Sequence, residues 1–263
     1  MTDNMIELES KRPLDLKEMT DARVALGRFG AGQPTKAALA FLLDHARARE
    51  AVWSEVDRAS METRLSSQGF ETVRVDSEAG DRSTYVRRPD LGRRLSAASM
   101  EQLQACAKIQ SAPDVVIVIA DGLSSSAVEI NAPRLVEELA WRLRAQGLSI
   151  GPIVLAGQTR VALGDPVGEV LGARLTIMLI GERPGLSAAD SLGAYVTYGP
   201  RRGTPDSRRN CISNIRDGGL DCLSAASAIG DLVASICKTG TSGVALKDAS
   251  AQVDRLRFGM ECQ

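Results

Sequence analysis

Residues 115–122 read Val-Val-Ile-Val-Ile-Ala-Asp-Gly, a continuous apolar run of mainly β-branched side chains that ends at a polar pair. A run without polar alternation is typical of a strand that is buried on both faces of a sheet. A helical pattern follows from Asn131-Ala-Pro133 to Gly147, since proline suits the start of a helix and glycine commonly follows its end. This part of the chain therefore predicts a buried strand followed by a crossover helix.

The rest of the C-terminal part repeats this pattern. Three more apolar runs follow, at residues 150–155, 175–180 and 194–198. A short helical segment begins at Asp165-Pro166, and a long one runs from about Leu223 to Lys238. Strands and helices that alternate at this spacing favour a mostly parallel sheet with right-handed crossovers. We therefore predict an α/β fold, with a Rossmann-like, mostly parallel sheet flanked by helices in a domain of residues 111–263.

Residues 1–110 are predicted to form a smaller, mainly helical region. Thr35 can cap a first helix, and residues 95–109 have the spacing of another. Residues 71–75 and 84–87 instead alternate between polar and apolar side chains, with a turn between them. This alternation predicts a β-hairpin within the helical region.

The composition excludes several functional classes. A net charge of −1 and an aromatic content of 3% do not fit a nucleic-acid binder, which needs a basic surface and stacking platforms. Five cysteines without a CxxC pair and a single histidine, His45, argue against a disulfide framework or a zinc site. The sequence shows neither a secretory signal nor a run of about 20 apolar residues that could span a membrane. We expect a cytoplasmic protein.

Four polar segments follow predicted strands or precede the last helix, at residues 121–126, 158–161, 181–185 and 208–215. Ligands of open parallel sheets bind at the carboxyl ends of the strands, so these segments are candidates for a binding site. Each also has a structural interpretation. The first can be a turn and a helix cap, Val161 a core residue, Glu182 half of a surface ion pair and Cys211 an inert thiol.

The residues alone leave the function open. One alternative is a stand-alone Rossmann-like nucleotide-binding enzyme, with Asp121 and Ser124–Ser126 at the phosphates. Another is a structural partner that contacts no cofactor. A Walker A loop is absent, and Gly27-Arg-Phe-Gly-Ala-Gly32 does not have the GxGxxG spacing. The four arginines Arg201, Arg202, Arg208 and Arg209 indicate either a solvated loop or a contact with phosphate or with carboxylates of a partner.

Longer stretches of the sequence resemble a known family. They read Val118-Ile-Ala-Asp-Gly-Leu-Ser-Ser-Ser-Ala, Gly168-Glu-Val-Leu-Gly-Ala, Leu179-Ile-Gly-Glu-Arg-Pro-Gly-Leu and Cys211-Ile-Ser-Asn-Ile-Arg-Asp-Gly-Gly. Two more lie upstream, Gly27-Arg-Phe-Gly-Ala-Gly-Gln-Pro-Thr and Arg87-Arg-Pro-Asp-Leu-Gly-Arg-Arg-Leu. In these stretches the chain resembles the small subunit (light chain) of adenosylcobalamin-dependent ethanolamine ammonia-lyase, over about residues 15–245.

The resemblance implies a heteromeric lyase that converts ethanolamine to acetaldehyde and ammonia by radical chemistry. The family's large subunit is a TIM barrel with the substrate pocket, and the small subunit closes over the cobalamin in a higher multimer of heterodimers. Residues 1–110 are then expected to contact the large subunit. The family-like region begins almost at the first residue, which argues against encapsulation in a bacterial microcompartment.

The resemblance also assigns residues of this chain. The family's cobalamin contacts fall on Val161, Glu182 and Cys211, and no catalytic residue is expected here. The loop after the first buried strand begins at Asp121 and contains no imidazole, and His45 lies in the N-terminal region. We therefore expect no metal ligand from this chain, and the cofactor's own benzimidazole to stay on cobalt.

Overall fold

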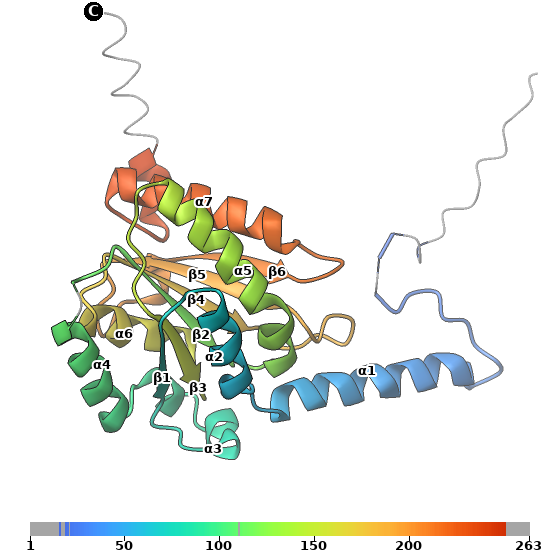
Figure 1. Ribbon diagram of the computed structural model, residues 1–263. Coiled ribbons are helices and arrows are strands. Elements are labelled where there is room, and N and C mark those ends of the chain that lie inside the picture. The colour runs from blue at the N-terminus through green and yellow to red at the C-terminus, as the bar shows by residue number, and fades with distance from the viewer. Residues whose placement is uncertain (1–15, 17–18, 21, 110, 251–263) are drawn as a thin grey trace, which may run out of the picture.

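The computed structural model describes residues 16, 19, 20, 22–109 and 111–250, and they form an α/β fold around one six-stranded sheet (Figure 1). The strand order is β1-β3-β2-β4-β5-β6. The strands are β1 (Thr72–Asp76), β2 (Val115–Ala120), β3 (Ile153–Gly157), β4 (Leu175–Gly181), β5 (Leu192–Tyr198) and β6 (Arg209–Ile215). The four strands predicted from apolar runs are confirmed as β2, β3, β4 and β5.

The α/β class is confirmed, but the sheet is mixed, so its predicted Rossmann-like, mostly parallel character is not. Strands β1, β3, β2 and β4 are parallel neighbours, whereas β5 is antiparallel to β4, and β6 to β5. The connections 182–191 and 199–208 contain no α-helix, and parallel strands need a longer crossover, usually a helix. These short connections therefore return the chain antiparallel.

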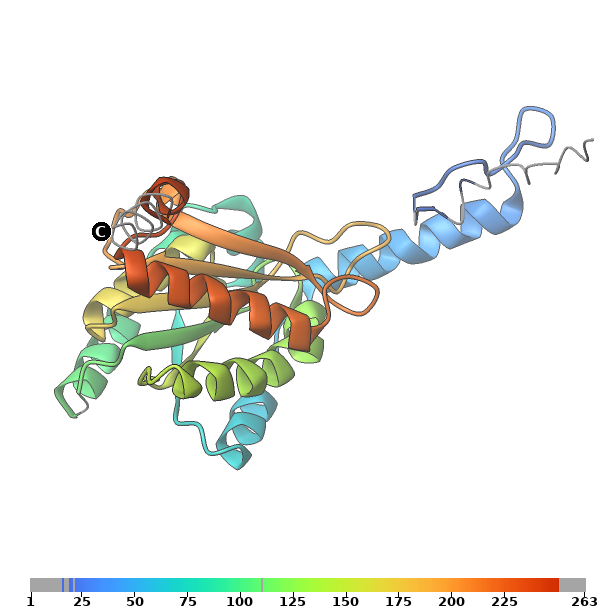
Figure 2. The same cartoon turned by 90° about the horizontal axis from the view of Figure 1, so that it is seen from above.

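Two layers of helices cover the sheet. On one face lie α2 (Arg58–Ser67), α5 (Ser125–Ala145) and α7 (Cys222–Thr239), packed on side chains such as Ile117 and Ile119. On the other lie α4 (Ala97–Ile109), the 3₁₀ turn η3 (Val161–Leu163) and α6 (Gly164–Val170), packed on Val116 and Val118. Figure 2 shows α5 and α7 side by side on their face. Strand β2 is fully buried between the layers, as its unbroken apolar run predicts.

Three details differ from the sequence predictions. Helix α5 begins earlier than predicted, at Ser125, and includes Pro133. The prediction of a hairpin is wrong for its second strand. Residues 84–87 belong instead to α3 (Arg82–Arg87), whose first turn is capped by the Asp81 carboxylate. Strand β1 is instead a sheet strand, parallel to β3. Thr35 is the first residue of α1 (Thr35–Trp53), so it does not cap the helix, and no side chain caps it from the preceding position.

The predicted domain boundary at residue 110 stays a prediction. The sheet does include β1, which lies on the N-terminal side of that boundary.

Helix α7 is apolar and long enough to cross a membrane by length and composition alone. One side of it is buried in the core under the sheet, next to α5. The residues on this side are Ala225, Ala226, Ile229, Gly230, Val233 and Ile236. Its packing as a core helix accounts for its apolar composition.

Helix α1 extends away from the sheet in both views (Figures 1 and 2). Its C-terminal end is anchored, because Ala51 is buried and the Val52 carbonyl accepts a hydrogen bond from the Arg82 guanidinium. The outer part leaves apolar side chains in solvent, among them Leu39, Leu42 and Leu43, which are 60%, 59% and 51% exposed. The helix is therefore attached to the body at one end only.

Candidate functional site

Glu182 directly follows β4 and is held in a fixed orientation. Its Oε2 accepts hydrogen bonds from Ser191 Oγ at 2.6 Å and from the Asn214 backbone N–H at 3.3 Å, and its Oε1 accepts one from Ser213 Oγ at 2.6 Å. Gly193 of β5 makes the space, because a Cβ there would lie 2.9 Å from Glu182 Oε1. The carboxylate is thus positioned by the start of β5 and the end of β6.

Cys211 lies on the edge strand β6, not in a loop as the sequence suggested. Its cross-strand partner is Tyr195 of β5, and its side chain is exposed. Glu182 is close to the same strand, since Ser213, two positions after Cys211 on β6, donates a hydrogen bond to its carboxylate. Tyr195 is a further neighbour of Cys211 that the sequence analysis did not single out.

The thiol and the phenol are both held in their neutral forms. Although Cys211 is exposed overall, neighbouring groups partly desolvate its thiol and raise its pKa; the Glu182 carboxylate raises it further, and a hydrogen bond with Tyr195 partly opposes this. Burial is also the main cause that raises the pKa of Tyr195, with the Cys211 thiol and Glu182 adding to it. A neutral thiol is a poor nucleophile, so this arrangement suits packing against a ligand and not covalent catalysis.

Val161 lies on the face of the sheet that is covered by α4 and α6, the face on which Tyr195 also packs. It begins η3, which follows β3, and it packs with Tyr195 against the apolar layer under α4 and α6. The structure therefore links Glu182 to the strand that carries Cys211, through Ser213 and Asn214, and it places Val161 in the apolar layer that Tyr195, the strand partner of Cys211, shares.

A buried ion pair connects these segments. Arg209 lies two positions before Cys211 on β6, and its guanidinium binds Asp165 of α6 through two hydrogen bonds of 2.5 and 2.8 Å. Both side chains are almost fully buried, at 3% and 2% exposure. Arg209 also donates to the Thr204 carbonyl and to Thr197 Oγ1. The interpretation of Arg209 as part of a solvated loop is therefore wrong.

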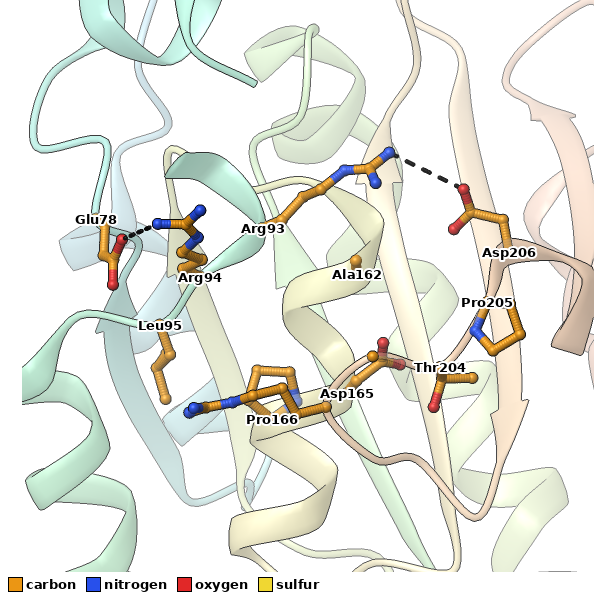
Figure 3. Close-up of a pocket in the computed structure, with 12 residues that line it drawn as sticks. Glu78, Arg93, Arg94, Leu95, Ala162, Asp165, Pro166, Thr204, Pro205 and Asp206 are labelled. Carbon is orange, nitrogen blue, oxygen red and sulfur yellow. Dashed lines mark hydrogen bonds and ion pairs between the residues drawn. The ribbon is translucent and has the colours of Figure 1, made fainter. Parts of the chain in front are cut away.

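A cavity of about 540 Å³ opens beside the Val161 segment (Figure 3). It lies between the 3₁₀ turn η2 (Leu91–Arg93), the start of α6 and the loop that leads to the 3₁₀ turn η4 (Asp206–Arg208). The charged residues that line it are Glu78, Arg93, Arg94, Asp165, Arg202 and Asp206. Ala162, the residue after Val161, also lines it, so the cavity adjoins the predicted contact.

The polar groups at the carboxyl ends of β2 and β3 are paired within the protein, and only a small pocket of about 110 Å³ remains beside them. The Asp121 carboxylate accepts hydrogen bonds from the backbone N–H groups of Gly122, Gln158 and Thr159, at 2.7–2.9 Å, and pairs with Arg82 at 3.2 Å. Burial raises the pKa of Asp121, and the guanidinium and the three N–H groups oppose this. Backbone donors that a phosphate would need are already used.

The serines after Asp121 have structural roles as well. Ser124 Oγ caps α5 by accepting from the Ala127 N–H, and it donates to the Ala189 carbonyl at 2.6 Å. Gly122 has a φ of 56°, and a Cβ there would lie 2.2 Å from the Gly181 carbonyl oxygen. The interpretation as a turn and helix cap is confirmed, which does not favour the nucleotide-binding alternative.

Comparison with known proteins agrees with the resemblance. The family described as ethanolamine ammonia-lyase light chain matches residues 11–247. Proteins named ethanolamine ammonia-lyase small subunit from Bradyrhizobium diazoefficiens and Rhodopseudomonas palustris are each 49% identical to this chain. The first alignment covers 95% of both chains, and the second covers 90% of both. A protein of the same name from Ralstonia nicotianae is 47% identical over 93% of this chain and 90% of its own length. The chain therefore belongs to the ethanolamine ammonia-lyase light chain family.

Proposed function

We propose that this chain is the small subunit of a cytoplasmic ethanolamine ammonia-lyase and helps to bind adenosylcobalamin at the interface with a large subunit. The complex converts ethanolamine to acetaldehyde and ammonia, with the substrate pocket on the large subunit, and pairs of subunits assemble into a higher multimer. Family membership supports the reaction. The observation that carries the cofactor role is the preorganised Glu182 carboxylate beside exposed Cys211.

The hydrogen bonds of Glu182 leave room for one more donor. An ionised carboxylate offers about four acceptor positions, two on each oxygen. Ser191 and Asn214 use two positions on Oε2, and Ser213 uses one on Oε1. The remaining position on Oε1 can accept an N–H from a side-chain amide of the corrin or an O–H from its ribose. Glu182 therefore fits the donor groups of the cofactor.

The neighbouring side chains fit the apolar part of a corrin. Cys211 and Tyr195 are neutral, and Val161 adds an aliphatic surface on the same face of the sheet. Burying roughly 200 Å² of apolar cofactor surface would contribute about 5 kcal/mol at ~25 cal/mol per Å². Packing therefore outweighs any single polar contact in this proposal.

The division of chemistry follows from these residues. When bound, adenosylcobalamin supplies the radical chemistry through its cobalt–carbon bond, and the protein supplies binding, orientation and shielding. With the cofactor bound, Glu182 would hold the ring through one hydrogen bond, and Val161 and Cys211 would cover apolar surface and exclude water from it. Among the residues that the structure describes, no cluster of three His, Cys, Asp or Glu side chains could hold a metal ion.

Helix α1 is proposed as a contact with the large subunit. Its anchored end lies at the carboxyl edge of the sheet, where Glu55 accepts a hydrogen bond from Gln158. Glu182 lies at the same edge, directly after β4. A large subunit that covers a cofactor at this edge also reaches α1, whose exposed leucines at positions 39, 42 and 43 form an apolar stripe.

Co-expression with a large subunit tests the proposal. We expect the complex, but not this chain alone, to release ammonia from ethanolamine when adenosylcobalamin is added. Binding of the cofactor to the complex is followed by corrin absorbance after gel filtration. Turnover by the chain alone would contradict the division of roles. A complex that keeps the affinity of wild type for the cofactor when Val161, Glu182 and Cys211 are replaced would instead support a purely structural subunit.

A further inference from the structure

The cavity beside Val161 presents exposed guanidinium groups. It is lined by three arginines and three acidic residues, Arg93, Arg94, Arg202, Glu78, Asp165 and Asp206. Arg209 lies outside the lining, forms a buried pair with Asp165 and also donates a hydrogen bond to the Asp206 carboxylate. Because Arg209 engages two of the three carboxylates, the arginines of the lining are available to an anion.

The arginines are only weakly held by the protein. Arg93 and Asp206 face each other at 3.9 Å, and Arg94 and Glu78 at 3.5 Å (Figure 3). All four side chains are more than 40% exposed, and such pairs typically contribute about 0–1 kcal/mol. Within the described part of the chain, the Arg202 guanidinium forms no ion pair. A ligand can therefore recruit these donors at little cost.

The far wall of the cavity is fixed in place. The Arg209 guanidinium donates a hydrogen bond of 2.7 Å to the carbonyl of Thr204, and it forms an ion pair with Asp165 at the same time. Leu95 and Pro166 line the cavity with buried apolar surface. A fixed, partly apolar wall opposite exposed guanidinium groups suits an anion that is attached to a larger apolar body.

The position of the cavity identifies the anion. Ala162 lines it and follows Val161, the residue proposed to pack on the cofactor. The cofactor carries a phosphodiester in the nucleotide loop beside its corrin. Arginine binds phosphate through two parallel N–H donors, which a lysine cannot match. We propose that Arg94 and Arg202 bind this phosphodiester and that the cavity encloses the adjoining ribose and base. This inference rests on the proposed function.

Cobinamide provides the test, because it retains the corrin but lacks the phosphate, the ribose and the base. The dissociation constants of cobalamin and cobinamide are measured by absorbance with the co-expressed complex of both subunits. We expect the double variant Arg94→Ala/Arg202→Ala to weaken cobalamin binding at least tenfold, which corresponds to about 1.4 kcal/mol. Its affinity for cobinamide should stay within about twofold of that of wild type.

Arg201→Ala is the matched control, since Arg201 is an exposed neighbour that does not line the cavity. It should change neither dissociation constant. Equal loss of both ligands in the double variant, or loss of neither, would overturn the inference. So would weaker assembly with the large subunit at unchanged cobalamin affinity, because the arginines would then bind partner carboxylates. If the wild-type complex did not bind cobalamin, that result would contradict the proposed function, and this inference would fail with it.

Discussion

Arg209 and Asp165 form a bidentate ion pair that joins the edge strand β6 to the first turn of α6, with both side chains buried. Cys211 lies two positions after Arg209, and Val161 four positions before Asp165. The pair therefore fixes the strand that carries one proposed contact relative to the segment that carries another. Because the pair is desolvated, its loss affects both stability and the geometry of the site.

Breaking this pair should be costly. Asp165→Asn leaves the Arg209 guanidinium buried without a counter-charge, and such changes typically destabilise a protein by about 3–5 kcal/mol. The double variant Asp165→Leu/Arg209→Met removes both charges and should lose less stability than either single variant. Urea unfolding of the purified chain measures both effects.

The exposed pair of Arg88 and Asp90 offers the control, since it is also bidentate but solvated. Arg88→Ala should cost less than about 1 kcal/mol. If Asp165→Asn cost no more than Arg88→Ala, burial would not govern the strength of the Arg209 pair.

Glu182→Ala should weaken cofactor retention by the assembled complex and leave the fold intact. Loss of a hydrogen bond to a charged group costs about 1.5–3 kcal/mol, which is roughly a tenfold to hundredfold change in the dissociation constant. Gly193→Ala should act in the same direction, because its Cβ would displace Glu182 Oε1. Arg183→Ala, an exposed neighbour, is the control. A dissociation constant within twofold of wild type in Glu182→Ala would exclude Glu182 as a contact.

Alkylation of Cys211 should require a higher pH than alkylation of an ordinary exposed cysteine. Burial and the Glu182 carboxylate raise the pKa of the thiol, so the neutral form persists to a higher pH than in a free cysteine. The rate of iodoacetamide labelling, followed by mass spectrometry, should still rise with pH where an ordinary cysteine has reached its plateau. Glu182→Gln removes the neighbouring charge and should shift the profile to lower pH. An unshifted profile would mean that Glu182 does not act on the thiol.

Much of the fold could be predicted from strands that are buried on both faces. Strand β2 is recognisable from its own residues because every side chain is buried. Strand β6 is not, since it is an edge strand with mostly polar or exposed residues and only Ile215 fully buried. Helix α3 contains Tyr85 and Val86, residue types that are common in strands. The segment is nevertheless helical, because Tyr85 is buried by tertiary packing and the Asp81 carboxylate caps the first turn.

The site was predictable in part for the same reason. Glu182 follows a strand whose end is unambiguous, so its place at the edge of the sheet follows from the sequence. The cross-strand pair of Cys211 and Tyr195 depends on the antiparallel return of β5 and β6, which side-chain patterns alone do not reveal. The Arg209 pair brings together residues far apart in the chain, and arginine-rich loops are usually solvated.

Replacing exposed leucines of α1 should weaken assembly with the large subunit. Each leucine that becomes fully buried contributes about 1.5–3 kcal/mol, so Leu39→Ser/Leu43→Ser should weaken association more than tenfold. Arg49→Ala, an exposed polar position on the same helix, should have little effect. Sedimentation of mixtures of the two subunits measures the dissociation constant. An unchanged value in the double variant would mean that α1 is not part of the interface.

This chain should supply no nitrogen ligand to cobalt. His45 lies on α1 and stacks on Phe41, with 6.2 Å between the ring centroids, and it neither lines the cavity beside Val161 nor takes part in the hydrogen bonds of Glu182. Asp121, which follows the first buried strand, offers only carboxylate oxygens, and these already accept four hydrogen bonds. Imidazole suits cobalt better than hydroxyl or carboxylate oxygens, so the cofactor's own benzimidazole should stay on the metal. Electron paramagnetic resonance of the cob(II)alamin state, with nitrogen-15-labelled protein, checks this. The superhyperfine splitting should be the same with labelled and unlabelled protein, and also in His45→Ala, whereas a splitting that follows the protein label would place a protein nitrogen on cobalt.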